Sequence, residues 1–319
     1  MSETKTLKQG TNQGELVGIL SEKNLEIKLD SFVPNTNPKV DCHTIYGHII
    51  VSTDNGDFRV DVYQNSKKKN GDDNKMYDPV LSLFTTYVSD VESKKNPELV
   101  ADKVHVRFSA GINDYYSDTA KKLVSGVRFK FNGIKRAKED AANDIQITLG
   151  GFITKMTPEV RNEEETGRKL VEFAYIGYEN SIEPFNLVVS EEDDKEWFGM
   201  NFDTNDSCEL TIEPKFVTIG KKSSGVTFGK SKEIADGYDV LELTVIAANP
   251  PIVDEDLEGY YDAKDIKKCY DTRKVLLEKI EKDGKSGKKS TTSRATTPAK
   301  VTKDQVMAEF ADADDDIPF

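Results

Sequence analysis

The sequence predicts an all-β protein with two β-rich modules, a C-terminal helix and an acidic tail. Its 319 residues are enough for two ordinary domains plus tails. Short runs of alternating apolar and polar residues recur along most of the chain, and 21 glycines and 11 prolines punctuate them. No apolar stretch approaches the length of a membrane span, so we expect no membrane contact.

The first module is predicted over residues 14–140, after a polar N-terminal arm at 1–13 that we expect to be disordered. Its predicted strands are Gly14–Leu20 with Leu25–Leu29, Thr44–Val51, Phe58–Tyr63, Val104–Phe108 and Val127–Phe131. Asp54–Asp57 is a strong turn signal between the second and third of these strands. Apolar residues at spacings of three and four predict a helix over Asp78–Ser93.

The second module is predicted over residues 141–255 and repeats the same order of elements. Its predicted strands are Ile145–Met156, Lys169–Tyr178, Phe185–Val189, Cys208–Ile219 and Tyr238–Ala247. A short helix is predicted over Ser190–Gly199, with Ser190 as its N-cap and acidic residues in its first turn.

Three strands, a helix and two strands form the chain order of the OB-fold, a five-stranded barrel. We therefore predict two OB-fold-like five-stranded barrels in tandem. Gly18, Gly150 and Gly151 lie inside the first strand of each module, where such a barrel bends sharply. The alternative is one continuous β-sandwich built from all of these strands.

The C-terminal part of the chain reads as three segments. Residues 256–283 contain a predicted helix, Asp262–Lys282, whose apolar face packs on the second module or forms an oligomer contact, so self-association stays open. Residues 284–303 form a basic linker without apolar periodicity, which we expect to be flexible. Residues 304–319 carry six acidic residues and no basic one.

The last residues form a chemically specific peptide, Asp312-Ala-Asp-Asp-Asp-Ile-Pro-Phe319. Asp314, Asp315 and Asp316 provide a negative field that attracts a basic partner surface. Pro318 restricts the backbone, Ile317 and Phe319 offer apolar side chains, and the terminal carboxylate suits a backbone nest or an arginine. An ordinary acidic solubility tail would explain the aspartates but not Ile317, Pro318 and Phe319 at the end.

At these residues the chain resembles the single-stranded-DNA-binding proteins of bacteria and bacteriophages, which commonly end in Asp-Ile-Pro-Phe. The resemblance covers Asp312–Phe319. It implies a protein that coats and protects single-stranded DNA without sequence specificity during replication, recombination and repair. The tip would recruit a polymerase, helicase, primase or recombinase, in the cytoplasm of the bacterial host. Two modules in one chain depart from the commonest bacterial form, which has one.

Net charge favours a second interpretation, an adaptor or competitor that mimics the tail without binding DNA. The chain has a net charge of −13, which is unusual for a nucleic-acid binder. Residues 278–303 carry eight basic and three acidic residues, so the body before them is strongly acidic. DNA binding would therefore need a local basic surface on an acidic protein and would depend strongly on salt.

Binding a single strand needs cations that follow the phosphates and aromatic rings that stack on bases. Alternation in the first module's strands turns several such side chains outward, and a lysine-rich loop follows its third strand. The candidate strand-binding residues are Tyr46, Arg59, Tyr63, Lys67, Lys68, Lys69, Arg107, Arg128, Lys130 and, in the second module, Lys215. Tyr115 and Tyr116 are expected in a loop, where they would either stack on bases or cover an edge, and Trp197 and Phe216 are expected in the core.

The sequence predicts no enzyme, cofactor or metal site. Gly225–Ser231 resembles a phosphate-binding loop but is one residue short and does not open a helix. The three histidines lack metal-ligand spacing, and the acidic runs are explained as a solvated loop and a helix start, although a metal-dependent nuclease stays a rival. Three widely spaced cysteines suggest neither a disulfide framework nor a zinc site, which fits a reducing, cytoplasmic setting.

Overall fold

A computed structural model of the chain describes residues 6–29, 32–34, 38–161, 164–190, 192–223 and 234–286. It divides into two compact units, which we treat separately. Unit A comprises Gln13–Ile145 and the chain from Arg273, and unit B comprises Met1–Asn12 and Gln146–Thr272. Helix α4, Ala263–Lys285, contributes its first half to unit B and its second half to unit A.

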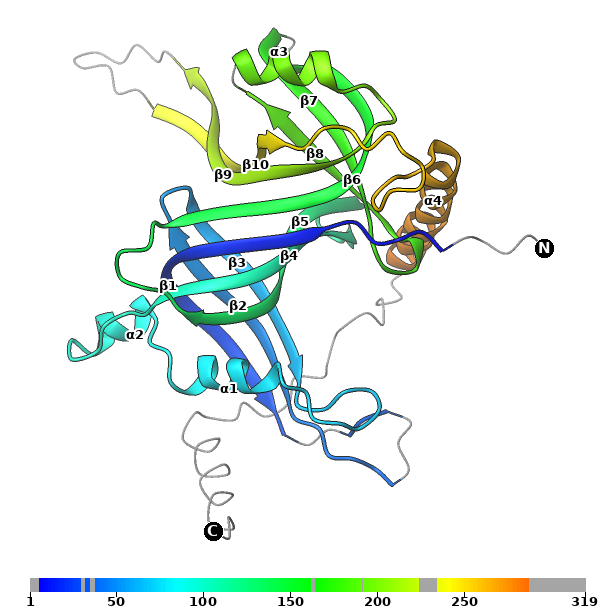
Figure 1. Ribbon diagram of the computed structural model, residues 1–319. Coiled ribbons are helices and arrows are strands. Elements are labelled where there is room, and N and C mark those ends of the chain that lie inside the picture. Colours follow the sequence, from blue (N-terminus) through cyan, green and yellow to red (C-terminus); the bar gives the residue numbers. More distant parts are fainter. Residues whose placement is uncertain are drawn as a thin grey trace, which may run out of the picture. The chain divides into compact units, whose positions relative to one another are not determined.

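Unit A is built from five strands and two short helices (Figure 1). Its strands are β1 (Asn12–Lys28), β2 (Thr44–Thr53), β3 (Gly56–Asn65), β4 (Lys103–Ser117) and β5 (Lys122–Arg136). They pair in the order β2-β3-β5-β4-β1, and β1 also pairs with β2, so the ladder closes on itself. The β3–β5 pair is parallel and the others are antiparallel.

Unit B repeats this connectivity. Its elements are β6 (Asp144–Arg161), β7 (Glu164–Ile176), β8 (Ile182–Val189), α3 (Glu192–Asn201), β9 (Ser207–Ser223) and β10 (Ile234–Ala248), with a 3-10 turn at Tyr178–Asn180. The strands pair in the order β6-β7-β8-β10-β9, and β9 also pairs with β6. Each strand of unit B therefore has a counterpart in unit A at the same place in the ladder.

The all-β class with a C-terminal helix is confirmed, and both units have the predicted strand order. The alternation of side chains explains the packing. In β3, Phe58, Val60 and Val62 are buried while the residues between them face out. The rings of Phe108 and Phe129 meet in the core of unit A with their centroids 4.8 Å apart.

The single helix predicted over Asp78–Ser93 is wrong. The structure has two helices there, α1 (Tyr77–Thr85) and α2 (Asp90–Lys95). Ser89 caps α2 in a reciprocal capping box with Glu92, and the carboxylate of Asp102 accepts a hydrogen bond from the backbone of Val88. These polar contacts hold an extended residue between two segments whose apolar spacing alone suggested one helix.

The expectation that Tyr115 and Tyr116 lie in a loop is also wrong, because β4 continues to Ser117. Asn113 and Asp114 resemble a turn in the sequence, yet they pair with Gly126 and Ser125 of β5. The negative charge of Asp114 is compensated by an ion pair with Arg273 at 2.8 Å, and both side chains are about nine-tenths buried. Among the described residues, no helix is both long and apolar enough to cross a membrane.

Candidate nucleic-acid interface

The outer face of β2 and β3 carries two tyrosines in direct register. Tyr46 of β2 lies opposite Tyr63 of β3, and the next outward rows pair His48 with Asp61 and Ile50 with Arg59. Tyr63 is 69% exposed, and Arg59 is also exposed. Arg59 and Tyr63 thus face outward, as the alternation predicted, because Phe58, Val60 and Val62 fill the core.

Tyr46 is held more firmly than Tyr63. Its hydroxyl donates a hydrogen bond of 2.7 Å to Glu26 of β1, which lies opposite it in the β1–β2 ladder. Burial, with the hydrogen bond and negative charge of Glu26, raises the pKa of Tyr46 to about 12. Tyr46 is therefore a neutral ring fixed in place, beside a second ring that is free to meet a ligand.

Two cations of β5 extend this face. Val60 and Asp61 of β3 pair with Phe129 and Lys130 of β5. Because Phe129 points into the core, Lys130 and Arg128 point outward on the same side as Asp61 and Arg59. Arg128 is exposed and Lys130 is partly covered.

The same side of β5 continues along its hairpin with β4. Arg128 lies opposite Gly111, Gly126 opposite Asn113, and Val124 opposite Tyr115. A side chain at Gly126 would meet no heavy atom within 4 Å, so this part of the surface is open. Tyr115 is exposed, whereas Tyr116 points to the opposite side, against Gly284 of α4.

We name this surface the tyrosine–arginine face and define it by Tyr46, Arg59, Tyr63, Tyr115, Arg128 and Lys130. The register places tyrosines at its two ends and the cations between them. At about 3.3 Å per residue it runs for roughly 25 Å along the strands. Tyr115 was not among the residues predicted to bind the strand, because a loop was expected there and the structure continues β4 to Ser117.

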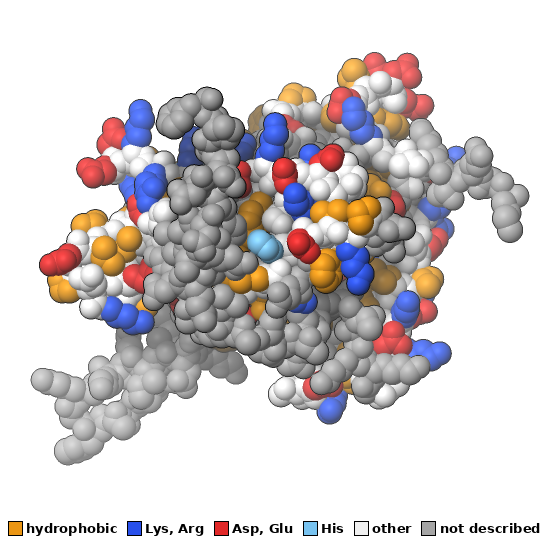
Figure 2. Space-filling view, turned by 90° about the horizontal axis from the view of Figure 1, so that it is seen from below, with side chains coloured by type: hydrophobic (Ala, Val, Ile, Leu, Met, Phe, Trp, Pro, Cys, Tyr) orange, Lys and Arg blue, Asp and Glu red, His pale blue; other side chains and the backbone are white. Residues whose placement is uncertain are grey.

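Acidic residues share the tyrosine–arginine face. Arg59 forms an ion pair of 2.9 Å with Asp61, and both side chains are substantially exposed, so solvent weakens this pair. Burial, with the positive charge of Arg59, lowers the pKa of His48, which is therefore a neutral side chain at neutral pH. Figure 2 shows described basic and acidic side chains interspersed on the visible side, with no continuous basic area there.

The lysine-rich loop after β3 is folded onto itself. Lys67 pairs with Asp73 through a β-bridge and an ion pair of 2.6 Å, and the hydrogen bond to Asp73 raises the pKa of Lys67. The carbonyl of Lys68 accepts a hydrogen bond from the backbone of Gly71. Lys68 and Lys69 are exposed, so they are the freer cations beyond the Tyr63 end of β3.

Two predicted residues lie elsewhere. Arg107 of β4 is exposed, but its cross-strand neighbours are Glu15 of β1 and Gly133 of β5, apart from the tyrosine–arginine face. Lys215 belongs to unit B, where it lies opposite Glu242 in the β9–β10 ladder. The structure therefore does not bring these two cations together with Arg59, Arg128 and Lys130.

Glu242 is part of a network of two glutamates and two arginines in unit B. Arg161 and Arg168 each contact Glu242 at 2.9 Å and also contact Glu159. The Glu242 side chain is only 3% exposed. These carboxylates satisfy both guanidinium groups, so the cluster ties the β6–β7 hairpin to β10 and is not a vacant anion site.

Trp197 and Phe216 were expected in the core of unit B, and this is wrong. Both are partly exposed, at 45% and 41% respectively. The buried aromatic positions here are taken by Phe198 of α3 and by Phe202 just after it, whose rings stack with centroids 4.5 Å apart. Phe216 lies on the β9–β10 hairpin opposite Leu241.

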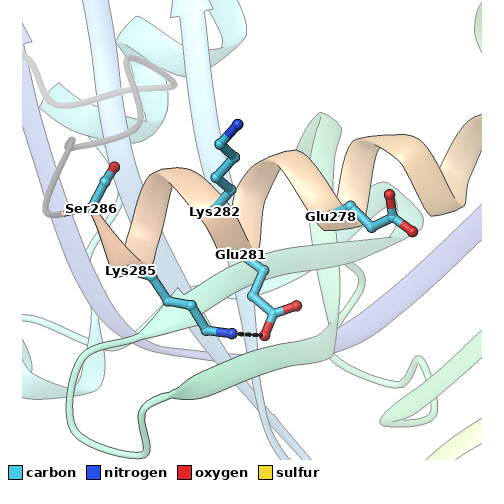
Figure 3. A pocket seen from close by; sticks show the side chains of 5 residues that line it. All are labelled: Glu278, Glu281, Lys282, Lys285 and Ser286. Atoms are coloured by element: carbon cyan, nitrogen blue, oxygen red, sulfur yellow. Dashed lines mark hydrogen bonds and ion pairs between the residues drawn. The ribbon is translucent and has the colours of Figure 1, made fainter.

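A shallow pocket lies along the last turns of α4 and is not a convincing ligand site. Its lining residues are Glu278, Glu281, Lys282, Lys285 and Ser286 (Figure 3). Four of them belong to α4 and Ser286 directly follows it. Lys285 is paired with Glu281 at 2.6 Å, one helical turn away. In the described ranges no group of His, Cys, Asp or Glu side chains could hold a metal ion.

Several predicted features lie outside the described residues. They are the linker from residue 287, the acidic tail with Asp314, Asp315, Asp316, Ile317, Pro318 and Phe319, and the loop Gly225–Ser231. The role of the tail therefore stays a prediction.

Comparison with known proteins identifies the family. Residues 11–283 match the family described as YorF. The chain belongs to the YorF family. The matched region of this YorF-family chain includes every strand of both units. No curated protein sequence matches it.

Solved structures similar to the YorF-family chain include two of the single-stranded DNA binding protein from Thermus aquaticus, the wild-type protein and a deletion mutant. Both are 12% identical to it with a TM-score of 0.41. The alignments cover 79% and 78% of this chain and 98% of each of those chains.

Proposed function

We propose that this protein binds single-stranded DNA without sequence specificity through the tyrosine–arginine face of unit A. The observation that carries the proposal is the register that places exposed Tyr63 beside Tyr46 and continues through the outward cations of β3 and β5 to Tyr115. Bases stack on aromatic side chains whatever their identity, and cations contact the phosphates between them. The strands that correspond to β2 and β3 carry oligonucleotides in many OB-folds.

The C-terminal peptide supports the second half of the proposed function. Asp314–Phe319 would recruit a polymerase, helicase, primase or recombinase to the coated strand. In this proposal the protein acts without a cofactor in bacterial or phage DNA replication, recombination and repair, in the cytoplasm of the host.

Strand binding is tested by fluorescence anisotropy of a labelled oligo-dT across a salt series, with duplex DNA of the same length as the control. We expect binding at low salt that weakens steeply as salt rises, since phosphate contacts release counterions. Duplex should bind much less well, because paired bases cannot stack on Tyr63 or Tyr115. Failure of the intact protein to bind oligo-dT at low salt, or equal binding of duplex, would refute the proposal.

An adaptor that carries the tail without binding DNA is the second candidate. The net charge of −13 and the interspersed charges in Figure 2 favour it. It predicts that the intact protein captures replication proteins and leaves oligo-dT unbound at every salt concentration. The same titration therefore separates the two functions.

A further inference from the structure

We propose that single-stranded DNA binds unit A alone, and that the chain's own helix α4, with the segment before it, closes the hairpin end of the corresponding face of unit B. This inference rests on the proposed strand-binding function and assigns it to one of two units with the same connectivity. The comparison is direct, because β6, β7 and β8 occupy the ladder positions of β1, β2 and β3.

The outer face of β7 and β8 is apolar at its hairpin end, which corresponds to the rows Ser52–Asp57 and Ile50–Arg59 of unit A. Ile176 lies opposite Ile182, and the next outward row pairs Ala174 with Pro184. Ala174 is also paired with Phe152 of β6. Phe152, Ala174, Ile176 and Ile182 are all buried, although they point away from the core side on which Phe173 and Phe185 lie.

Their cover is the segment that leads into α4. Tyr261, Ile266 and Cys269 pack with these four residues in one buried cluster, and Leu7 and Tyr270 border it. Hydrogen bonds fix the cover: the backbone of Tyr261 donates to the Ser207 hydroxyl at 2.9 Å, and the Tyr261 hydroxyl donates to the carbonyl of Lys8 at 3.1 Å. A strand that displaced this cover would return the whole apolar cluster to water, which costs more than stacking one base returns.

Beyond the cover, the row that corresponds to Tyr46 and Tyr63 pairs Leu170 with the buried Val188. Glu172 lies opposite Asn186, and Lys155 is engaged with Glu172 at 3.4 Å. The outward positions of the described β7 and β8 residues hold no tyrosine, phenylalanine or tryptophan. These rows of unit B therefore offer no exposed ring, and the cations beside them, Lys155 and Arg168, are engaged with glutamates. Unit A presents exposed Tyr63 and Arg128 on the corresponding strands.

Matched substitutions in the full-length protein test this assignment. In unit A, Tyr63→Ala combined with Arg128→Ala should weaken oligo-dT binding by at least tenfold. In unit B, three exposed changes, Tyr178→Ala, Lys155→Ala and Tyr238→Ala, should each leave affinity within twofold. These side chains are exposed, so the variants should fold, which circular dichroism checks.

Photo-crosslinking to oligo-dT with peptide mapping gives an independent readout. Crosslinks should fall in peptides that contain Tyr46, Tyr63 or Tyr115, and none should fall in 164–189 or 238–248. Crosslinks in those unit B peptides, or a tenfold loss from a unit B substitution, would overturn the inference while leaving strand binding intact. If the unaltered protein binds no oligo-dT, that result contradicts the proposed function itself and therefore also this inference, which rests on it.

Discussion

Tyr63 lies directly opposite Tyr46 in the β2–β3 ladder, with the Tyr46 hydroxyl bound to Glu26 and the Tyr63 ring 69% exposed. The pair therefore combines a fixed ring with a free one on a rigid sheet. Such a platform loses little side-chain entropy when a base stacks on it.

Tyr63→Ala should weaken oligo-dT binding by about 1–3 kcal/mol, which is roughly 5- to 150-fold, because it removes the exposed stacking surface. Tyr63→Phe is the matched control and should bind almost as well as the unaltered protein, since it keeps the ring. Anisotropy titrations at one fixed salt concentration compare the three proteins. Equal affinity of the alanine variant and the unaltered protein would rule out stacking on Tyr63.

Gly126→Glu should weaken strand binding without destabilising the protein. The new carboxylate would lie on the open side of β5, two residues from Arg128, where nothing lies within 4 Å of the added Cβ. Glycine inside a strand is unfavourable, so replacing it should leave the melting temperature unchanged or slightly higher. We expect roughly a three- to tenfold loss of affinity at low salt, which high salt largely removes.

Gly126→Gln is the control for this change, because it adds similar bulk without charge. It should retain most of the affinity if the surface attracts phosphates. An equal loss in both variants would mean that the effect is steric, and no loss in either would place the strand away from β5.

Arg128→Met should flatten the salt dependence of binding. If Arg128 contacts one phosphate, the slope of log affinity against log salt should fall by about 0.7, the value for one phosphate of a single strand. Arg107→Met is the matched control and should leave the slope unchanged, because Arg107 lies between Glu15 and Gly133. The reverse result would move the binding surface to β4 and β1.

The sequence predicted which side chains face outward where apolar and polar residues alternate. It predicted the strand ends wrongly where polar residues lie inside a strand. The alternation of Phe58, Val60 and Val62 was enough to turn Arg59 and Tyr63 outward. The pairing of Asn113 and Asp114 with β5 could not be foreseen, because the buried partner of Asp114 is Arg273, 159 residues away.

The contrast between the two units was equally hidden in the sequence. Ile176 and Ile182 read as ordinary strand residues, and only the packing of Tyr261 and Ile266 on them shows that an outer face is covered. This contact joins segments about eighty residues apart, and the periodicity of apolar residues within one segment cannot predict it.

Glu242→Gln should destabilise unit B by about 2 kcal/mol, because it leaves Arg161 and Arg168 with one carboxylate between them. The loss is smaller than for a fully buried pair because the side chains of both arginines reach solvent. Urea unfolding followed by the emission of Trp197, the only tryptophan in the chain, measures the loss. An unchanged unfolding midpoint would show that the network adds no stability.

Acid should weaken the same network. Burial opposes ionisation of Glu159, but hydrogen bonds from Thr166 and Arg168 outweigh it and hold the pKa of Glu159 below its ordinary value of 4.5. A lowered pKa in the folded state stabilises the protein above the ordinary value, and that contribution is lost as the pH falls through the folded-state pKa. The unfolding midpoint should therefore drop below about pH 4.5, and less steeply in Glu159→Gln.

Removal of Asp314–Phe319 should separate the two halves of the proposed function. Capture of replication and recombination proteins should be abolished, because the terminal Ile-Pro-Phe and its aspartates are the docking peptide. Strand affinity should stay the same or rise slightly at low salt, since the acidic tip would otherwise compete with DNA for Arg59 and Arg128.

Replacing Asp314, Asp315 and Asp316 with Asn in the intact chain tests the charge alone. This variant keeps Ile-Pro-Phe and should give the same small rise in strand affinity. A marked loss of strand affinity in either variant would mean that the tail contributes to DNA binding directly, contrary to the proposal.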